Sequence, residues 1–172
     1  MRALRRDRVE SEQDFPRDVA ELQQLLGPAQ PGQRIIAMPG AGTNVPIWLL
    51  GSSLFSAQLA AERGLPYAFA SHFAPRLLLQ AIDLYRRNFR PSATLAAPYV
   101  VIGVPLIGAP TDEEAEFLAS STYQRVLGIL TGDRRRLQPP VANFAAGLHT
   151  QERAAIGDFL AAAVIGGPDT VR

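Results

Sequence analysis

The chain has 172 residues, of which 47% are hydrophobic and 19% are charged, and its formal net charge is +1. This composition is typical of one soluble globular domain. It lacks both the charge excess of nucleic-acid-binding proteins and the low hydropathy of disordered chains. With no cysteine, the chain has no disulfide, no thiolate nucleophile and no cysteine-ligated metal. His72 and His149 lie far apart in the sequence, so we expect no metal site.

No apolar run reaches the roughly 18 residues that a membrane-spanning helix requires. The basic start MRALRRDR is followed by VESEQDF rather than by an apolar core, so no secretion signal is expected. We therefore expect a cytoplasmic protein that has neither a nucleic acid nor a membrane as its partner.

The first part of the chain alternates apolar runs with turn-rich links. Four apolar residues share one helical face and predict a helix over 11–26. The run RIIAMP at 34–39 is short and apolar, which favours a strand. A buried strand is expected at 46–50, and the spacing that follows predicts a helix over 54–63.

The rest of the chain continues the alternation. The expected elements are a strand at 65–72, a helix at 75–89, a nearly continuous apolar strand at 98–108, a long helix from Thr111, a helix at 150–162, and an apolar segment with a Gly-Gly turn at 163–172. Apolar strands separated by helices are typical of parallel βαβ units whose strands are buried on both faces. The predicted fold class is therefore α/β, with parallel strands alternating with helices.

The apolar run PIWLL stops at Gly51-Ser52-Ser53, and a helical pattern starts at Leu54. In parallel α/β proteins the ligand site lies at the carboxyl ends of the strands. Gly51 permits a tight turn there, and two serine hydroxyls with the unpaired N–H groups of a helix start form a site for an anion, most often a phosphate. The alternative is that Ser52 or Ser53 only caps the helix, because serine is a favoured N-cap.

His72 ends an expected strand, where an imidazole is either a proton donor or polar contact for a ligand, or a structural side chain in a loop. The residues leave both interpretations open. We interpret the remaining candidates as structural: Trp48 and Tyr67 as core residues, Asp112, Glu113 and Glu114 as the start of a helix, His149 as a loop residue, and Arg134, Arg135 and Arg136 as a solvated loop.

The segment PIWLLGSSLFSAQLAAERGLPYAFASHFAP at 46–75 resembles the middle of the luciferase-like flavin-dependent monooxygenases. The blocks LRRDRVESEQDFPRDVAELQQLL, PYVVIGVPLIG and GGPDTVR resemble the same family in the same order, so the likeness covers nearly the whole chain. It implies a TIM barrel that binds FMN at the carboxyl ends of its strands. It also implies that reduced flavin, supplied by a reductase, and O₂ oxidise a small organic substrate.

The family pattern assigns roles to residues of this chain. It implies that Ser52 and Ser53 meet the flavin phosphate, with Gly51 and the backbone around Leu54 beside them. Ala70, Ser71 and His72 would line the pocket near the flavin ring or ribityl chain. Ser56 stands where relatives often carry Gly or Thr, so its hydroxyl is either a further contact or has no role.

A complete (β/α)8 barrel takes about 250 residues, whereas this chain has 172. We therefore expect a single luciferase-like domain over 1–172 that is a partial barrel, without the front strands, the last strand and the family's EHH-like histidine motif. Its catalytic residue is then unknown, with His72 the remaining candidate. Such a chain is a truncated product, a chain that completes its barrel with a second copy or a partner, or an open α/β layer.

Three functions stay open. The first is an FMN-dependent monooxygenase whose activity is impaired in the isolated chain. The second is a non-catalytic flavin-binding or subunit-type protein, and the third is an oxidoreductase that uses the deazaflavin cofactor F420.

Overall fold

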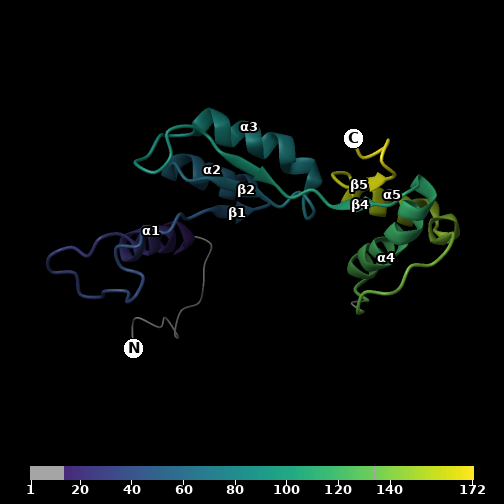
Figure 1. The fold of residues 1–172 in the computed structure, drawn as a ribbon, viewed down its shortest axis with the longest axis horizontal. Helices are drawn as coiled ribbons and strands as arrows, with labels where there is room; N and C mark the ends of the chain where they lie inside the picture. The colour runs from purple at the N-terminus through teal and green to yellow at the C-terminus, as the bar shows by residue number, and fades with distance from the viewer. Residues whose placement is uncertain (1–13, 134) are drawn as a thin grey trace. The chain divides into compact units, whose positions relative to one another are not determined.

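The computed structural model describes residues 14–133 and 135–172, which divide into two compact units between Trp48 and Leu49. The first unit holds helix α1 (Phe15–Leu26), purple in Figure 1, and a long loop. The helix has a proline in its first turn and buries Val19. It confirms the helix predicted over 11–26, except for residues 11–13, which, like Arg134, lie outside the described part of the chain.

The run at 34–39 is a loop, so the strand predicted there is wrong. Its backbone is held locally, with the side chain of Gln33 donating to the carbonyl oxygen of Ile35 at 2.8 Å. Pro39 has no N–H to give to a ladder. The apolar side chains of the run are exposed: Ile35 by 50%, Ile36 by 52% and Met38 by 79%.

The second unit begins with a parallel sheet of three strands in the order β1 (Leu49–Gly51), β2 (Tyr67–Phe69) and β3 (Val100–Ile102). Helix α2 (Leu54–Arg63) joins β1 to β2, and a 3-10 turn (Pro75–Leu77) with helix α3 (Leu78–Asn88) joins β2 to β3 (Figure 1). In the register of this sheet Gly51 pairs with Phe69, and Phe69 pairs with Ile102. The carboxyl ends of the three strands therefore meet at one edge.

A second parallel sheet pairs β4 (Leu106–Gly108) with β5 (Val164–Gly166). Helix α4 (Asp112–Thr131), a 3-10 turn (Phe144–Gly147) and helix α5 (Thr150–Phe159) connect these strands. The single strand predicted at 98–108 is thus wrong: it is two strands in different sheets. The N–H of Gly103 makes the last hydrogen bond to β2, at 3.1 Å from the carbonyl oxygen of Phe69, and Pro105 two residues later has no N–H to continue the ladder.

Helices α2 and α3 lie against each other through small side chains, and Ala57, Ala60 and Ala61 of α2 and Ala81 of α3 are fully buried. The rings of Tyr67 and Tyr85 lie 5.4 Å apart, and both side chains are fully buried. Tyr67 is therefore a core residue, as predicted. Trp48 is 42% exposed, so its assignment to the core is wrong. The ladder of β1 begins only at Leu49, one residue after it.

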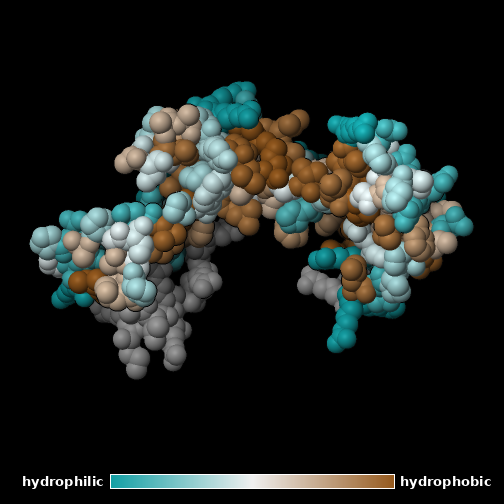
Figure 2. Space-filling view, viewed as in Figure 1, coloured by the Kyte–Doolittle hydropathy of each residue, from teal (hydrophilic) through white to brown (hydrophobic). Residues whose placement is uncertain are grey.

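Apolar side chains of β3, β4 and the link between them are exposed and form part of the brown surface in Figure 2. Those at least 42% exposed are Val101, Ile102, Val104 and Leu106. The prediction that the strands are buried on both faces is therefore wrong for β3 and β4. Within residues 14–133 and 135–172, no helix is both long enough and apolar enough to cross a membrane.

Candidate functional site

The Gly-Ser-Ser join lies at the carboxyl end of β1 and opens helix α2. Ser53 is the N-cap of α2, with extended backbone angles, and its side chain accepts a hydrogen bond from the N–H of Ser56 at 3.3 Å. The capping interpretation is therefore confirmed for Ser53. Ser52 lies outside the helix, and among the described residues its hydroxyl has no hydrogen-bond partner.

Packing against Ser56 explains why position 51 is a glycine. A Cβ atom placed on Gly51 would overlap both Oγ and Cβ of Ser56. The backbone of Gly51 does not have the positive φ that favours glycine elsewhere. The side chain of Ser56 thus occupies the space that any larger residue at position 51 would need.

A buried hydroxyl network underlies the helix start. The Ser56 hydroxyl donates to the carbonyl oxygen of Ser53 at 2.8 Å, and the Tyr67 hydroxyl lies 3.2 Å from Ser56 Oγ and donates to the Ser53 carbonyl at 3.3 Å. Ser56 is 7% exposed and Tyr67 is fully buried. Burial raises the pKa of the Tyr67 hydroxyl, which therefore stays protonated at neutral pH. Ser56 faces this network rather than the solvent at the join.

A set of polar groups at the join remains available to a ligand. The first N–H groups of any α-helix have no intrahelical partner, and in α2 the Ser53 side chain satisfies only that of Ser56. The N–H groups of Leu54 and Phe55 have no partner among the described residues. Together with the hydroxyls of Ser52 and Ser53, we call these groups the phosphate site. Their number and the helix dipole fit a small oxyanion.

Ser71 and His72 follow β2 at the same edge of the sheet. Ser71 is fully buried, and its hydroxyl donates a short hydrogen bond to the carbonyl oxygen of Gly103, just after β3. Ser71 thus fastens the ends of β2 and β3 together. Its hydrogen is already engaged, which the sequence did not reveal because Gly103 lies 32 residues further along the chain.

His72 is exposed in a turn, and its ring centroid lies 4.2 Å from that of Phe73. The imidazole lies close to Gly103, where an added Cβ would be 3.4 Å from His72 Nδ1. Among the described residues no hydrogen bond holds the imidazole. His72 therefore places an imidazole that packs on Phe73, and has no hydrogen-bond partner among the described residues, at the edge of the sheet where the phosphate site also lies. Across the part of the chain that the structure describes, no cluster of three or more His, Asp or Glu side chains is arranged to hold a metal ion.

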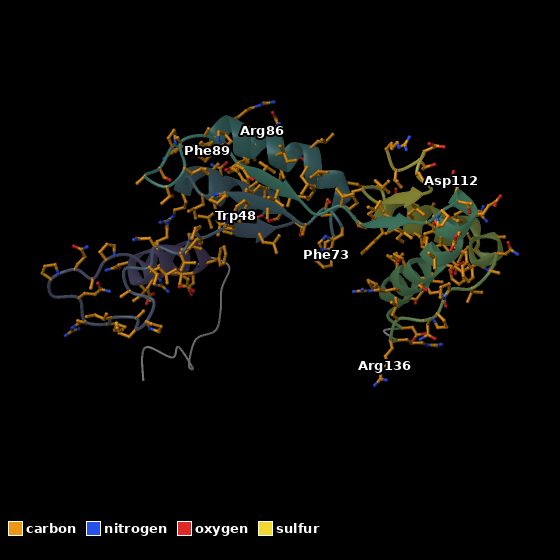
Figure 3. All side chains as sticks on the ribbon, in the orientation of Figure 1. Trp48, Phe73, Arg86, Phe89, Asp112 and Arg136 are labelled. Carbon is orange, nitrogen blue, oxygen red and sulfur yellow. The ribbon has the colours of Figure 1, made fainter. Side chains whose placement is uncertain are left out.

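The acidic start of α4 contains a link that the sequence missed. Thr111 caps the helix by accepting from the N–H of Glu114 at 3.1 Å, which confirms the interpretation of the acidic residues as a helix start. Asp112 also accepts hydrogen bonds from the N–H of Gly167 at 2.5 Å and from Oγ1 of Thr170 at 2.8 Å. These two donors hold the pKa of Asp112 below its usual range. Asp112 thus ties α4 to the Gly-Gly turn after β5 (Figure 3).

The fold and the site define a class of protein: an α/β protein with polar groups gathered at the carboxyl ends of parallel strands. A sequence model of the family described as Luciferase-like monooxygenase matches residues 1–172. The chain therefore belongs to the luciferase-like monooxygenase family.

Individual proteins with similar sequences or structures support this family assignment. Over 172 residues the chain is 44% identical to a Bacillus subtilis (strain 168) protein named "Uncharacterized protein YvbT", with 99% of this chain and 51% of that protein covered. Over 172 residues it is 43% identical to an Escherichia coli (strain K12) protein named "Luciferase-like monooxygenase", with 100% of this chain and 51% of that protein covered. The crystal structure of apo-MsnO8 matches with a TM-score of 0.72 and 30% identity over 98% of this chain and 51% of that chain.

The chain spans about half the length of the curated relatives it matches. Its parallel strands alternate with helices and match part of the apo-MsnO8 structure, which confirms the predicted α/β fold class of a partial TIM barrel. The described strands lie in two separate sheets and do not close into a barrel. In a complete barrel the inward-facing side chains of the strands form packed layers.

Proposed function

We propose that this chain is part of an FMN-dependent monooxygenase and supplies the site for the flavin phosphate. FMN, bound in its reduced form, would supply the electrons with which O₂ oxidises a small organic substrate. The observation that supports this proposal is the set of unpartnered polar groups at the start of α2. Neighbouring hydroxyls there are engaged in the network of Ser53, Ser56 and Tyr67, whereas the Ser52 hydroxyl and two N–H groups are not.

The chain's own groups have distinct parts in this proposal. The hydroxyl of Ser52 and the N–H groups of Leu54 and Phe55 donate to phosphate oxygens, and the hydroxyl hydrogen of Ser53 is a further donor. Each hydrogen bond to a charged group contributes about 1.5–3 kcal/mol. Gly51 has an indirect part: it leaves room for Ser56, which holds the Ser53 carbonyl and so sets the direction of α2.

The flavin pocket continues along the same edge in this proposal. Ser71 is fully buried and fixes the ends of β2 and β3, so its part in the pocket is to hold these strand ends in place. His72 is the candidate proton donor or acceptor, because its imidazole is exposed and has no hydrogen-bond partner among the described residues. We propose that the protein acts in the cytoplasm. We propose that residues 1–172 act as a single luciferase-like domain.

A non-catalytic flavin-binding or subunit-type role is the alternative that one observation favours. The chain spans about half of its relatives, and apolar side chains on β3 and β4 are exposed, as a chain that pairs with a second copy or a partner would require. Such a protein would bind FMN without turnover. An F420-dependent oxidoreductase would instead bind F420 and not FMN.

The test compares FMN with riboflavin, which lacks the phosphate, by fluorescence titration of the 172-residue chain. We expect FMN to bind more tightly, and Ser52→Ala to weaken FMN binding about tenfold, the equivalent of about 1.4 kcal/mol or one charged hydrogen bond. Riboflavin binding should stay unchanged. Ser121→Ala in α4 is the matched control, since its hydroxyl has no hydrogen bond among the described residues.

Ser52→Ala is preferred to a change at Ser53 because Ser53 also caps α2. Equal affinity for FMN and riboflavin, or an unchanged FMN affinity in Ser52→Ala, would show that the phosphate site is wrongly assigned. FMN binding without oxygen transfer to any organic acceptor, in the presence of a flavin reductase and O₂, would favour the non-catalytic role.

A further inference from the structure

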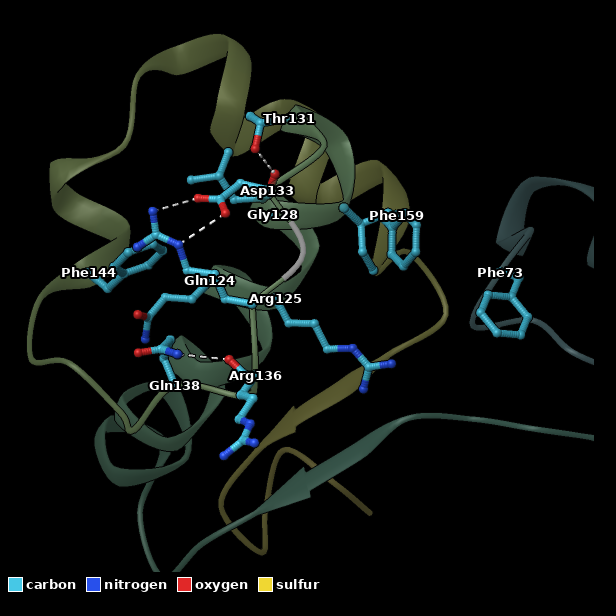
Figure 4. A pocket seen from close by; sticks show the side chains of 13 residues that line it. Phe73, Gln124, Arg125, Gly128, Thr131, Asp133, Arg136, Gln138, Phe144 and Phe159 are labelled. Atoms are coloured by element: carbon cyan, nitrogen blue, oxygen red, sulfur yellow. Dashed lines mark hydrogen bonds and ion pairs between the residues drawn. The ribbon is translucent and has the colours of Figure 1, made fainter.

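A pocket of about 660 Å³ lies between the second half of α4, the loop that follows it, the 3-10 turn at 144–147 and α5, and Phe73 of the turn after β2 also lines it (Figure 4). Its volume falls in the range of about 300–1,000 Å³ that is usual for small-molecule sites. Nothing in the proposed flavin chemistry uses it.

The loop that forms one wall of this pocket is fastened to α4 by hydrogen bonds. The side chain of Gln124 donates to the carbonyl oxygen of Pro139 at 3.0 Å. The N–H of Val141 donates to the hydroxyl of Ser120 at 2.8 Å, and Ser120 is almost fully buried. These two hydrogen bonds therefore hold the loop against α4 and fix this wall of the pocket.

The pocket carries an excess of positive charge. Its lining includes Arg125, Arg135 and Arg136 but a single carboxylate, Asp133. Arg135 is neutralised by Asp133 through two contacts, at 3.0 Å from Nε and 2.8 Å from Nη2. Among the described residues neither Arg125 nor Arg136 has a carboxylate or hydrogen-bond partner for its guanidinium, and no dashed line reaches either group in Figure 4.

Apolar and amide groups complete the lining. The lining has three rings, from Phe73, Phe144 and Phe159. It also includes the aliphatic side chains of Leu127 and Ile129 and the amide of Gln138. The amide of Gln138 donates to the carbonyl oxygen of Arg136 at 2.8 Å, which holds the backbone next to one of the two free cations. An apolar pocket with two guanidinium groups that have no partner among the described residues fits a ligand with an apolar body and a negatively charged end.

We propose that this pocket binds a small organic anion, with a carboxylate or phosphate held by Arg125 and Arg136 and a ring-sized apolar body held by the phenylalanines. The planar guanidinium group binds both kinds of oxyanion with paired hydrogen bonds, and it also stacks on rings. Arg135 and Arg136 are both exposed in the loop, as the solvated-loop interpretation predicts, and Arg135 pairs with its neighbour Asp133. The proposal gives Arg136 a ligand in addition. No residue that we assign to the flavin lines this pocket, although Phe73, which does line it, contacts His72.

The experiment is a calorimetric titration of the 172-residue chain with phenyl phosphate, benzoate, inorganic phosphate and benzyl alcohol. We expect saturable binding of phenyl phosphate or benzoate and none of the neutral alcohol. Binding of one of the two anions alone supports the proposal and identifies the charged end. Arg125→Gln and Arg136→Gln should each weaken binding at least tenfold. Circular dichroism checks that both variants remain folded.

The matched control is Arg86→Gln in α3, an exposed arginine that also has no ion pair among the described residues and lies away from the pocket (Figure 3). It should change binding less than twofold. Phe144→Ala should reduce the preference for phenyl phosphate over inorganic phosphate, which tests the apolar body separately. The proposal is overturned if neither aromatic anion saturates, if the Arg125 and Arg136 variants bind as well as the original chain, or if Arg86→Gln loses as much affinity.

Discussion

Replacing Gly51 by alanine tests the packing at the join between β1 and α2. The added methyl group would overlap both Oγ and Cβ of Ser56, and Ser56 is held by three hydrogen bonds to Ser53 and Tyr67. Because neither the β1 end nor the α2 start can yield freely, we expect the cost at the upper end of the range for overpacking, about 2–3 kcal/mol. Urea denaturation followed by circular dichroism measures it.

A double-mutant cycle with Ser56 assigns this cost to one contact. Ser56→Gly removes both overlapping atoms, whereas Ser56→Ala leaves the Cβ in place. We expect Gly51→Ala and Ser56→Gly together to cost less than the sum of the single changes, with a coupling of about 1–2 kcal/mol, and Ser56→Ala to rescue less.

The control for this cycle is Gly157→Ala in α5, where an added Cβ would meet nothing within 4 Å. That change should stabilise the chain by about 0.4–1 kcal/mol, because alanine loses less conformational freedom on folding than glycine. Two results would refute the packing argument. One is that the effects of Gly51→Ala and Ser56→Gly on the free energy of unfolding are additive. The other is that Gly51→Ala costs less than about 0.5 kcal/mol, which is the usual scatter of substitutions without a structural effect.

Two further predictions concern buried and charged hydrogen bonds. Tyr67→Phe should lower the free energy of unfolding, measured by urea denaturation, by about 1 kcal/mol, because the Ser56 hydroxyl still donates to the Ser53 carbonyl. A loss above about 3 kcal/mol would contradict this, because it exceeds the net contribution of one hydrogen bond. Asp112 has a lowered pKa, so its stabilisation is present above the ordinary carboxyl pKa and is lost as pH falls through the folded-state value. Asp112→Asn should therefore melt at a lower temperature than the original chain at pH 7, with the difference closing below about pH 4. Parallel melting curves from pH 3 to 7 would contradict this.

Local signals in the sequence were enough to predict several elements. Helix α2 has the predicted bounds because serine caps its start and Gly64 ends it with a φ of 60°, a conformation that glycine adopts readily. Helix α4 begins after Thr111 for the same kind of reason, with a threonine cap and three carboxylates in its first turn. The burial of Tyr67 followed from its place in an apolar run, whereas the sequence left open whether Ser52 or Ser53 caps α2.

Predictions failed where the outcome depended on distant partners. An apolar run becomes a strand only if another strand pairs with it, so 34–39 stayed a loop and 98–108 divided between two sheets. The bond from Ser71 to Gly103 spans 32 residues, and the bond from Asp112 to Gly167 spans 55. No local pattern encodes such contacts. The orientation of Ser56 was also left open, because it depends on Tyr67, 11 residues further along the chain and in the next strand.

The proposed phosphate site is formed by fewer elements of the fold than the rest of the proposed flavin pocket. Ser52, Ser53, Leu54 and Phe55 are consecutive, and the network that orients them is completed by Tyr67 within the same βαβ unit. The geometry of the phosphate site therefore depends on one strand, one helix and the next strand. The site residues of a TIM barrel come from the ends of several strands, so the rest of the proposed flavin pocket depends on more of the barrel. Recognition of the phosphate should accordingly be stronger in this chain than recognition of the ring, which is why the comparison of FMN with riboflavin is the most sensitive test of the proposed function.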